Sequence, residues 1–322
     1  MRIEEVSYDL LRPITTSKGK VGVRSGWIIT LEEGEFSGQG EVLPLEGWSD
    51  LTIDEAYSQL VECDNSLIGA QRLSKEVQSA INTASWNLEA AKKGTSLSGL
   101  IGAGKDHVRV NALIDGSNQK NLRDNVKESR AKGLNVFKVK LGFRDDQERV
   151  ELLSEIIQEG EKIRLDPNGN WSLQYAVTFL DRVRKTLGSR LEYVEDPVAN
   201  LEDLMKLRSI VPVEVAVDNL WASMEDLDTI TSENLGDYVV IKPALNGGID
   251  SSLEFSRCAS DNGLQTIISS TYDGPIALGA WCALAASLAP EATHGLGTAD
   301  LFNDERIKHL TPTAGKVFLL LD

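Results

Sequence analysis

Short apolar runs alternate with longer amphipathic stretches along most of the chain beyond about residue 106. Eight short runs have the apolar, β-branched character of strands, and they span 108–114, 136–141, 163–166, 191–195, 213–218, 238–242, 265–269 and 293–296. Helix-like stretches lie between them. Strands that alternate with helices at this rhythm predict a parallel sheet, and eight of them predict closure into a barrel.

Polar and apolar residues alternate within several of these runs. Successive side chains of a strand point to opposite faces, so Phe137 and Val139 lie opposite Lys138 and Lys140. The same alternation recurs at 163–166, 213–218 and 238–242. We expect the apolar face to pack under outer helices and the polar face to point into the barrel. An antiparallel sheet with one wet face is the alternative, but a helix after each strand argues against it.

The first hundred residues have a different pattern. Three alternating runs are typical of antiparallel strands and two helical stretches follow them, at 3–11, 27–31, 38–42, 52–63 and 74–93. We therefore predict an α+β domain over 1–105 and a barrel domain over 106–302. A last β-like run at 317–321 is expected to return to the N-terminal domain, so that the segment from about 303–322 joins it.

Composition narrows the class of protein. The chain has 322 residues, of which 41% are hydrophobic, as in a globular protein with a large core. The longest apolar stretch, 277–289, is too short to span a membrane and indicates a buried helix. A charged N-terminus and three cysteines without paired spacing predict a cytoplasmic protein with reduced thiols. The net charge of −16 argues against nucleic acid, and an anionic substrate would need local cations.

Five predicted strands end in residues that could hold, or work beside, a metal ion. In chain order these are Lys138 and Lys140, Asp166, Glu195, Asp218 and Lys242. The C-terminal ends of barrel strands meet at one face, where the active sites of such barrels lie. Three carboxylates on consecutive strands form a hard-oxygen site suited to Mg²⁺, with Mn²⁺ able to replace it. The histidines and cysteines show no competing zinc spacing.

Together these motifs resemble the enolase superfamily, in its muconate-cycloisomerase-like subgroup. The resemblance covers nearly the whole chain and rests on the order and spacing of motifs that are individually unspecific: Lys138-x-Lys140, Asp166-Pro-Asn168, Glu195-Asp196-Pro197, Asp218 and Lys242-Pro243 with Gly247-Gly248. It implies an α/β fold, a modified (β/α)₇β TIM-like barrel with an α+β capping domain. The His-Asp dyad of mandelate-racemase-like members is missing, and opposed lysines fit the muconate-like pattern better.

Within the subgroup the chain is most similar to the o-succinylbenzoate synthases of menaquinone biosynthesis, on softer signals at 24–27, 40–44, 268–273, 278–279 and 294–302. This implies Mg²⁺-dependent syn-dehydration of 2-succinyl-6-hydroxy-2,4-cyclohexadiene-1-carboxylate, a small anionic substrate. Lys140 would be the base, Lys138 would lower its pKa, and Lys242 would stabilise the anion from the opposite wall. N-acylamino-acid racemases and dipeptide epimerases share this skeleton and stay as alternatives, as does a non-catalytic binding protein.

Five more residues are weaker candidates for contacts to the substrate or the lysines: Asn168, Arg164, Ser269, Ser270 and Gly247. Each has a structural alternative. The role of Asn168 could be confined to forming a turn, the serines could cap a helix near Pro275, and Gly247 could belong to a plain turn. Arg164 could pair with Glu214 in the barrel floor. Asn219 stands where many relatives carry Glu, so the hydrogen bonds around Asp218 are expected to differ.

Overall fold

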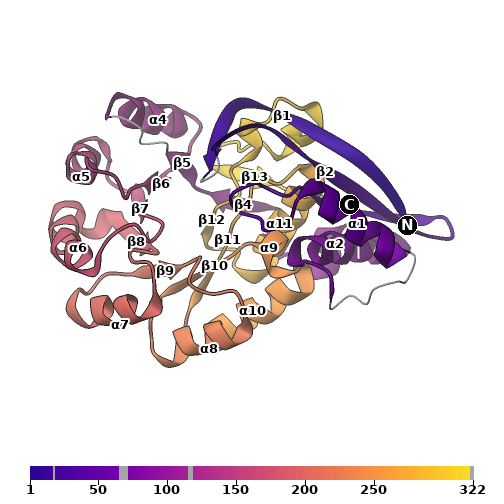
Figure 1. Ribbon diagram of the computed structural model, residues 1–322. Coiled ribbons are helices and arrows are strands. Elements are labelled where there is room, and N and C mark those ends of the chain that lie inside the picture. Colours follow the sequence, from indigo (N-terminus) through magenta and orange to yellow (C-terminus); the bar gives the residue numbers. More distant parts are fainter. Residues whose placement is uncertain (17–18, 65–71, 115–118, 320–322) are drawn as a thin grey trace.

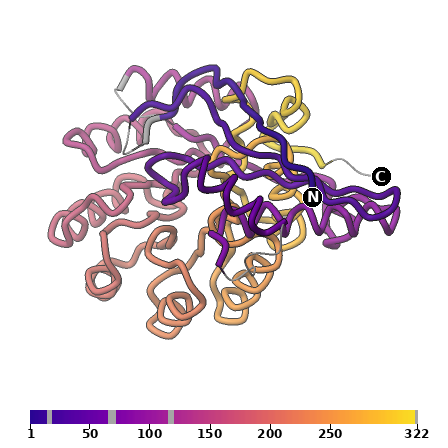
Figure 2. Tube along the Cα trace, turned by 45° about the vertical axis from the view of Figure 1, so that its right-hand side comes forward, coloured from indigo at the N-terminus to yellow at the C-terminus, as the bar shows by residue number. Residues whose placement is uncertain are grey.

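The computed structural model describes residues 1–16, 19–64, 72–114 and 119–319. An antiparallel N-terminal sheet with helices lies against a curled parallel sheet of seven strands, whose helices form an outer arc (Figure 1). The predicted fold class is thus confirmed: a modified (β/α)₇β barrel with an α+β capping domain. Figure 2 shows the N-terminal strands, in indigo, running across the barrel.

The N-terminal sheet has the order β1-β2-β3. Its strands and the helices that follow are β1 (Arg2–Thr16), β2 (Gly19–Glu33), β3 (Phe36–Val42), α1 (Ile53–Asp64), α2 (Lys75–Lys92) and α3 (Leu97–Ile101). Helix α2 begins after Ser74, whose hydroxyl accepts a hydrogen bond from Val77 N. A Cβ atom at Gly38 or Gly40 would overlap the backbone of α2, so these glycines let the helix lie directly on β3.

The barrel strands appear where the hydrophobic pattern predicts them. They are β4 (His107–Val110), β5 (Ala112–Ile114), β6 (Val136–Lys140), β7 (Lys162–Asp166), β8 (Leu191–Glu195), β9 (Val215–Val217), β10 (Tyr238–Ile241), β11 (Gln265–Ile268) and β12 (Thr293–His294). The main helices between them are α4 (Gln119–Ala131), α5 (Asp146–Ile156), α6 (Leu173–Leu187), α7 (Leu201–Ile210), α8 (Met224–Ser232), α9 (Pro243–Asn246), α10 (Ile249–Asp261) and α11 (Pro275–Leu288). Strands β5 to β11 are parallel neighbours in chain order.

The ring closes through its first and last strands, where one prediction needs correction. The expected single strand 108–114 is divided at Asn111 into β4 and β5. β5 pairs with β6, whereas β4 pairs with β12. β12 reaches β11 through a bridge between Ser269 and Gly295 and through the ring of His294, whose Nδ1 accepts from Ile268 N at 3.0 Å. Because of this division, residues 107–114 pair with β6 on one side and with β12 on the other, which joins the first and last strands of the barrel.

The alternation of side chains in the strands is confirmed. Phe137, Val139 and the matching residues of later strands are buried in the main core, which lies toward the helices. The inward positions below the polar residues hold a separate apolar cluster, formed by Tyr193, Ala216, Val240 and Ile267. The barrel interior is therefore packed below its polar upper end.

The C-terminal strand differs from the prediction. Strand β13 (Lys316–Phe318) pairs antiparallel with β4 of the barrel and not with the N-terminal sheet. An earlier part of the segment does reach that sheet, because Asn303 N donates to Asp9 O at 2.8 Å and Phe302 bridges to Leu10. β13 instead occupies the free edge that the division at Asn111 leaves on β4. Residues 320–322 lie outside the described residues.

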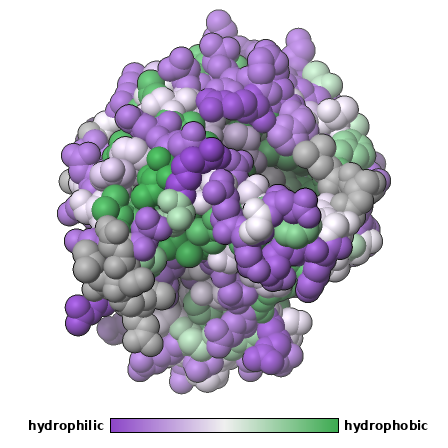
Figure 3. All heavy atoms as spheres, turned by 90° about the vertical axis from the view of Figure 1, so that its right-hand side faces the viewer, coloured by the Kyte–Doolittle hydropathy of each residue, from purple (hydrophilic) through white to green (hydrophobic). Residues whose placement is uncertain are grey.

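Helix α11 is the predicted buried apolar helix, with most of its residues inaccessible. Among the residues described, no helix has the length and apolar character needed to cross a membrane. On the side of the N-terminal domain most of the visible surface is hydrophilic, with smaller apolar areas between (Figure 3).

Candidate active site

Five consecutive strands end in the predicted polar residues. β6 ends at Lys140, β7 at Asp166 and β8 at Glu195, while Asp218 and Lys242 directly follow β9 and β10. The ladder places Lys140 beside Asp166 and Lys138 beside Arg164. Since parallel neighbours end at the same edge, the structure brings all three lysines and all three carboxylates to one end of the barrel.

Lys138 is the deeper of the two lysines on β6. Its Nζ is 2.9 Å from Asp166 Oδ2 and 2.6 Å from Glu195 Oε1, and its side chain is 14% exposed, against 30% for Lys140. Burial by itself lowers the pKa of Lys138, but attraction to Asp166, Glu195 and Asp218 outweighs it and holds this pKa well above its usual value. Lys138 is therefore a fixed cation in this arrangement.

Lys140 lies nearer the mouth. Its Nζ donates to Asp166 Oδ2 at 2.6 Å and to Asn168 Oδ1 at 3.4 Å. Asn168 also forms the turn after β7, with φ at +50° and its N–H donating to Asp166 Oδ1. Both interpretations of Asn168 thus apply, because the left-handed turn is what aims its side chain at Lys140.

The carboxylates on β7 and β8 have opposite electrostatic environments. Burial raises the pKa of Asp166, but Lys138 and Lys140 together pull it well below its usual value. For Glu195, burial and the charges of Asp166 and Asp218 outweigh Lys138 and raise the pKa to about 8. Negative charge is therefore only partly compensated at the centre of the site.

The opposite wall is built by Asp218, Asn219 and Lys242. Lys242 Nζ donates to Asp218 Oδ2 at 2.6 Å and to Asn219 Oδ1 at 3.5 Å. The amide nitrogen of Asn219 donates to Asp196 Oδ2 at 2.9 Å. The neutral amide therefore connects a cation and an anion, where a carboxylate would have added a further negative charge.

Asp196 is a site residue whose role the sequence did not predict. Its carboxylate accepts hydrogen bonds from Asp218 N at 3.0 Å and Asn219 N at 2.7 Å. Burial, and then the charge of Asp218, raise its pKa to about 6. Its φ of +42° is positive, as are those of two other non-glycine residues near the site, Asn168 and Tyr272. Such conformations persist where their surroundings hold them, so Asp196 fixes the backbone that presents Asp218.

Trp48 and Tyr272 also belong to the site and were not predicted. Trp48 comes from the capping domain and its ring centre lies 5.0 Å from Lys242 Nζ. Tyr272 follows β11, and the two ring centres are 5.8 Å apart. Together they place an aromatic wall beside Lys242, in a geometry that favours a cation.

Arg164 lies in the barrel floor with a partner other than the predicted one. Its Nε donates to Glu192 Oε2 at 2.6 Å and its guanidinium lies 4.7 Å from the ring centre of Tyr193. Glu214 is exposed instead. The register of β7 and β8 skips Glu192, so a bulge turns this residue toward Arg164.

Ser270 and Gly247 serve local structure. The Ser270 hydroxyl donates to Asp273 Oδ2 at 3.0 Å and does not cap α11, whose N-cap is Gly274. Gly247 ends the short helix α9 with φ at +94°, and its N–H donates to Pro243 O. The turn interpretation of Gly247 is the one that the structure shows. Ser269 bridges β11 to Gly295 and is half-buried at the same end of the barrel.

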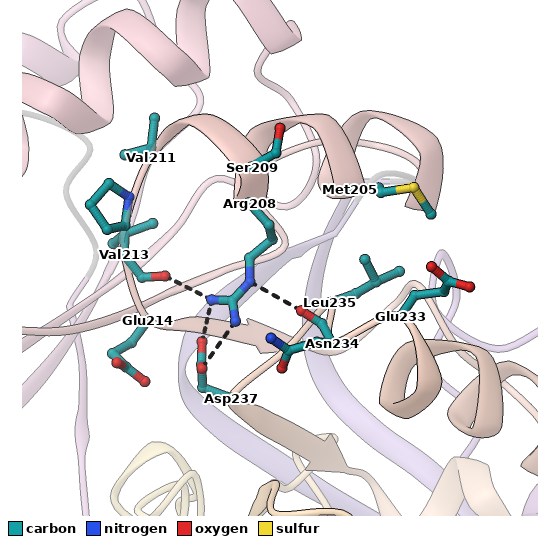
Figure 4. Close-up of a pocket in the computed structure, with 11 residues that line it drawn as sticks. Met205, Arg208, Ser209, Val211, Val213, Glu214, Glu233, Asn234, Leu235 and Asp237 are labelled. Carbon is teal, nitrogen blue, oxygen red and sulfur yellow. Dashed lines mark hydrogen bonds and ion pairs between the residues drawn. The ribbon is translucent and has the colours of Figure 1, made fainter.

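A surface pocket of about 550 Å³ lies at the other end of the strands (Figure 4). Arg208 of α7 projects into it and pairs with Asp237, which precedes β10, at 2.5 Å. This pocket is far along the strands from the lysines and carboxylates and brings no catalytic group together.

Comparison with known proteins agrees with this geometry. The family model "Enolase C-terminal domain-like" matches residues 121–316, which is more than half of the chain and most of the barrel. The chain belongs to the enolase superfamily. A second model, "MenC, N-terminal domain", matches residues 10–93 of the capping domain.

Individual relatives of this enolase-superfamily chain point to more than one activity. An o-succinylbenzoate synthase of Aliivibrio fischeri is 26% identical over 282 residues, which cover 87% of this chain and 84% of that protein. The L-Ala-D/L-Glu epimerase of Bacillus subtilis has a TM-score of 0.90 at 18% identity, covering 100% of this chain and 96% of that one. A dipeptide epimerase of Enterococcus faecalis, solved with Mg and a dipeptide, has a TM-score of 0.86 at 20% identity, covering 99% and 96%. These structural likenesses show the fold alone.

The carboxylates at the barrel mouth are the donors that a superfamily metal ion would need. Asp166, Glu195 and Asp218 are all buried, come from consecutive strands and offer hard oxygen ligands. Within the described ranges they are not gathered into a ready three-ligand cluster. Lysine ammonium groups stand between them and already neutralise one oxygen of each. The donor set fits Mg²⁺, provided that these ammonium groups move aside.

Proposed function

We propose that this protein is an o-succinylbenzoate synthase, a carbon–oxygen lyase that dehydrates 2-succinyl-6-hydroxy-2,4-cyclohexadiene-1-carboxylate in menaquinone biosynthesis. The opposed pair Lys140 and Lys242 above three strand-end carboxylates supports removal of a proton next to a carboxylate, a step that the synthase shares with other enzymes of the superfamily. The match of the capping domain to the MenC N-terminal family and the coverage of synthase relatives support this activity over others of the superfamily. A cytoplasmic location is part of the proposal.

In the proposed site Mg²⁺ is held by Asp166, Glu195 and Asp218, with Mn²⁺ able to replace it. When bound, this cation supplies charge that offsets the negative charge growing on the substrate carboxylate. Each of these carboxylates pairs with a lysine ammonium group, so the chain itself supplies positive charge at the site.

The proton steps belong to the chain's own residues. Lys140, more exposed than Lys138 and on the same face, takes the proton from the carbon next to the substrate carboxylate. The carbon–oxygen bond to the neighbouring hydroxyl then breaks, and Lys140 returns its proton to the departing hydroxide, which leaves as water. Lys138 keeps the local potential positive, and Lys242 faces the anion from the opposite wall.

Racemisation or epimerisation of an N-acylated amino acid or dipeptide is the second candidate. It has a specific basis, because Lys140 and Lys242 stand on opposite walls and could act as two bases. A non-catalytic binding protein is a weaker candidate, since it needs neither a base nor an opposed cation and all six polar groups are in place.

The test is a direct assay with both substrate classes. Purified protein with Mg²⁺ should convert the cyclohexadiene carboxylate to o-succinylbenzoate, followed by its ultraviolet absorbance. N-succinyl amino acids and dipeptides should be epimerised more slowly, as followed by optical rotation. Epimerisation without dehydration would replace the proposal by the second candidate, and inactivity in both assays would favour the binding protein.

A further inference from the structure

Arg24 is a buried cation that the proposed chemistry leaves without a role. It lies on β2 of the capping domain and is only 1% exposed. Burying a charge is costly unless it is paired and hydrogen-bonded. The hydrogen bonds of Arg24 explain how its charge can stay buried.

The guanidinium donates to backbone carbonyls of two loops that are far apart in the sequence. Its two terminal nitrogens reach Pro44 O at 2.8 Å and Leu43 O at 2.5 Å, in the capping-domain loop after β3. Its Nε reaches Tyr272 O at 3.1 Å, in the loop after β11. The planar fork of Arg presents donors in fixed directions, which the single ammonium of Lys cannot reproduce.

Nearby carboxylates stabilise the positive charge of Arg24. Burial lowers its pKa to about 10, while the nearby carboxylates of Asp273 and Glu41 oppose this shift. Arg24 therefore stays protonated at neutral pH. Asp273 is itself held by Trp281 Nε1 at 3.1 Å and by Ser270. This side of the interface between the domains is thus fixed.

The two loops carry the aromatic wall. Trp48 lies four residues beyond Pro44, and its ring approaches both Tyr272 and Lys242. Tyr272 has φ at +61°, a left-handed conformation that a bulky residue keeps only where its surroundings hold it. The bond from Arg24 to the Tyr272 carbonyl is one contact that holds this peptide in place.

We propose that Arg24 is a positioning residue that joins the capping-domain loop 43–49 to the barrel loop 270–274. Through this junction it places Trp48 and Tyr272 over the mouth of the barrel beside Lys242. The consequence for substrate binding rests on the proposed function of Lys242. The junction of the two loops does not, and it can be measured without a substrate.

The experiment compares Arg24→Met and Arg24→Lys with Arg208→Met. Arg208 is a matched control because it also donates to a backbone carbonyl, Val213 O at 3.0 Å, and pairs with an Asp, but at the opposite end of the barrel (Figure 4). Amide hydrogen exchange is followed by mass spectrometry on peptides covering 43–49 and 270–274. Both Arg24 variants should exchange there at least about tenfold faster than wild type, whereas Arg208→Met should not.

The kinetic readout separates positioning from general destabilisation. In the Arg24 variants kcat/KM should fall about 10- to 100-fold, mostly through KM, since a misplaced wall weakens substrate binding. Arg208→Met should keep wild-type constants. If Arg24→Met does not fold, Arg24→Lys carries the test.

Unchanged exchange in both loops of a folded Arg24 variant, with an unchanged KM, would overturn the proposal. If wild type turns over neither candidate substrate, the proposed function fails, and the exchange measurement still decides the role of Arg24.

Discussion

At the scale of single residues, the site is a set of cations and anions whose positions follow from strand ends. Lys140 and Lys138 share one face of β6 but differ in depth, which gives the outer lysine access to a substrate and the inner one a fixed charge. Asn219 accepts a hydrogen bond from Lys242 and donates one to Asp196. Lys242 therefore stays linked to Asp196 although this position carries Asn where many relatives carry Glu.

Lys242→Arg tests whether Lys140 acts as the base while Lys242 only stabilises negative charge. If Lys242 only stabilises charge, the variant keeps part of the dehydration activity because the cation remains. Epimerisation should collapse in both directions, by about 10²–10⁴-fold, since Arg cannot act as a base. Both assays on one preparation give the ratio. Equal losses in the two reactions would contradict the assigned roles.

At the scale of elements, three neighbouring strands contribute one carboxylate each, and the loops after them determine how these groups are held. The turn at Asn168 and the strained Asp196 fix the ends of β7, β8 and β9 through backbone hydrogen bonds. The carboxylates alone would repel one another, and the lysine ammonium groups that pair with them offset this repulsion.

Metal removal tests this arrangement of strand ends. Dialysis against a chelator should abolish turnover, and added Mg²⁺ or Mn²⁺ should restore it. Asp218→Asn should weaken Mg²⁺ binding, measured by calorimetry, by at least about tenfold, since a hard cation prefers charged oxygens. Asp237→Asn, at the opposite end of β10, is the control and should bind as wild type. Full activity in metal-free protein would refute the site.

At the scale of the whole molecule, a buried histidine, His294, adds a side-chain hydrogen bond to the backbone contacts that close the barrel. His294 accepts from Ile268 N through Nδ1, and its Nε2 donates to Ala289 O. Burial lowers its pKa to about 4, and Arg164 and Arg109 add to this effect. A proton on Nδ1 would break the bond to β11, so the neutral ring is part of the folded state.

The pH dependence of stability follows from this shift. The pKa of His294 is lower in the folded than in the unfolded chain, so the unfolded state binds more protons between about pH 6.5 and 4. His294 should therefore cost up to about 3 kcal/mol of stability as pH falls through this window, and nothing above it. Urea unfolding of His294→Gln should lose this part of the pH dependence. The exposed His309→Gln is the control, and an identical slope in both variants would contradict the assignment.

Much of this molecule could be predicted from the sequence, because alternate residues of a strand point to opposite faces of the sheet. The position of a residue along its strand then indicates how deep in the barrel its side chain lies. Lys138, Lys140 and the three carboxylates follow from that rule and from the convergence of parallel strands. The contacts of Arg24 with Tyr272 could not be predicted, because they join positions 248 residues apart through a left-handed peptide. The pairing of Arg164 with Glu192 depends on a bulge, which the alternating pattern does not reveal.

Solvent deuterium exchange distinguishes which lysine removes the proton next to the substrate carboxylate, a role that the proposed mechanism gives to Lys140. Wild type, Lys140→Ala and Lys138→Ala are incubated with the cyclohexadiene carboxylate and Mg²⁺ in ²H₂O, with Lys162→Ala as a control for loss of a lysine at the start of β7. Substrate recovered at partial turnover is analysed by mass spectrometry.

Lys140→Ala should fold and bind Mg²⁺ but lose dehydration activity by about 10²–10⁴-fold or more, because the base that also delivers a proton to the leaving hydroxide is gone. Exchange at the substrate α-position should vanish in this variant, persist at a reduced rate in Lys138→Ala and be unchanged in Lys162→Ala. Exchange that persists in Lys140→Ala and disappears in Lys138→Ala would show that Lys138 is the base, and the roles of the two lysines would be reversed.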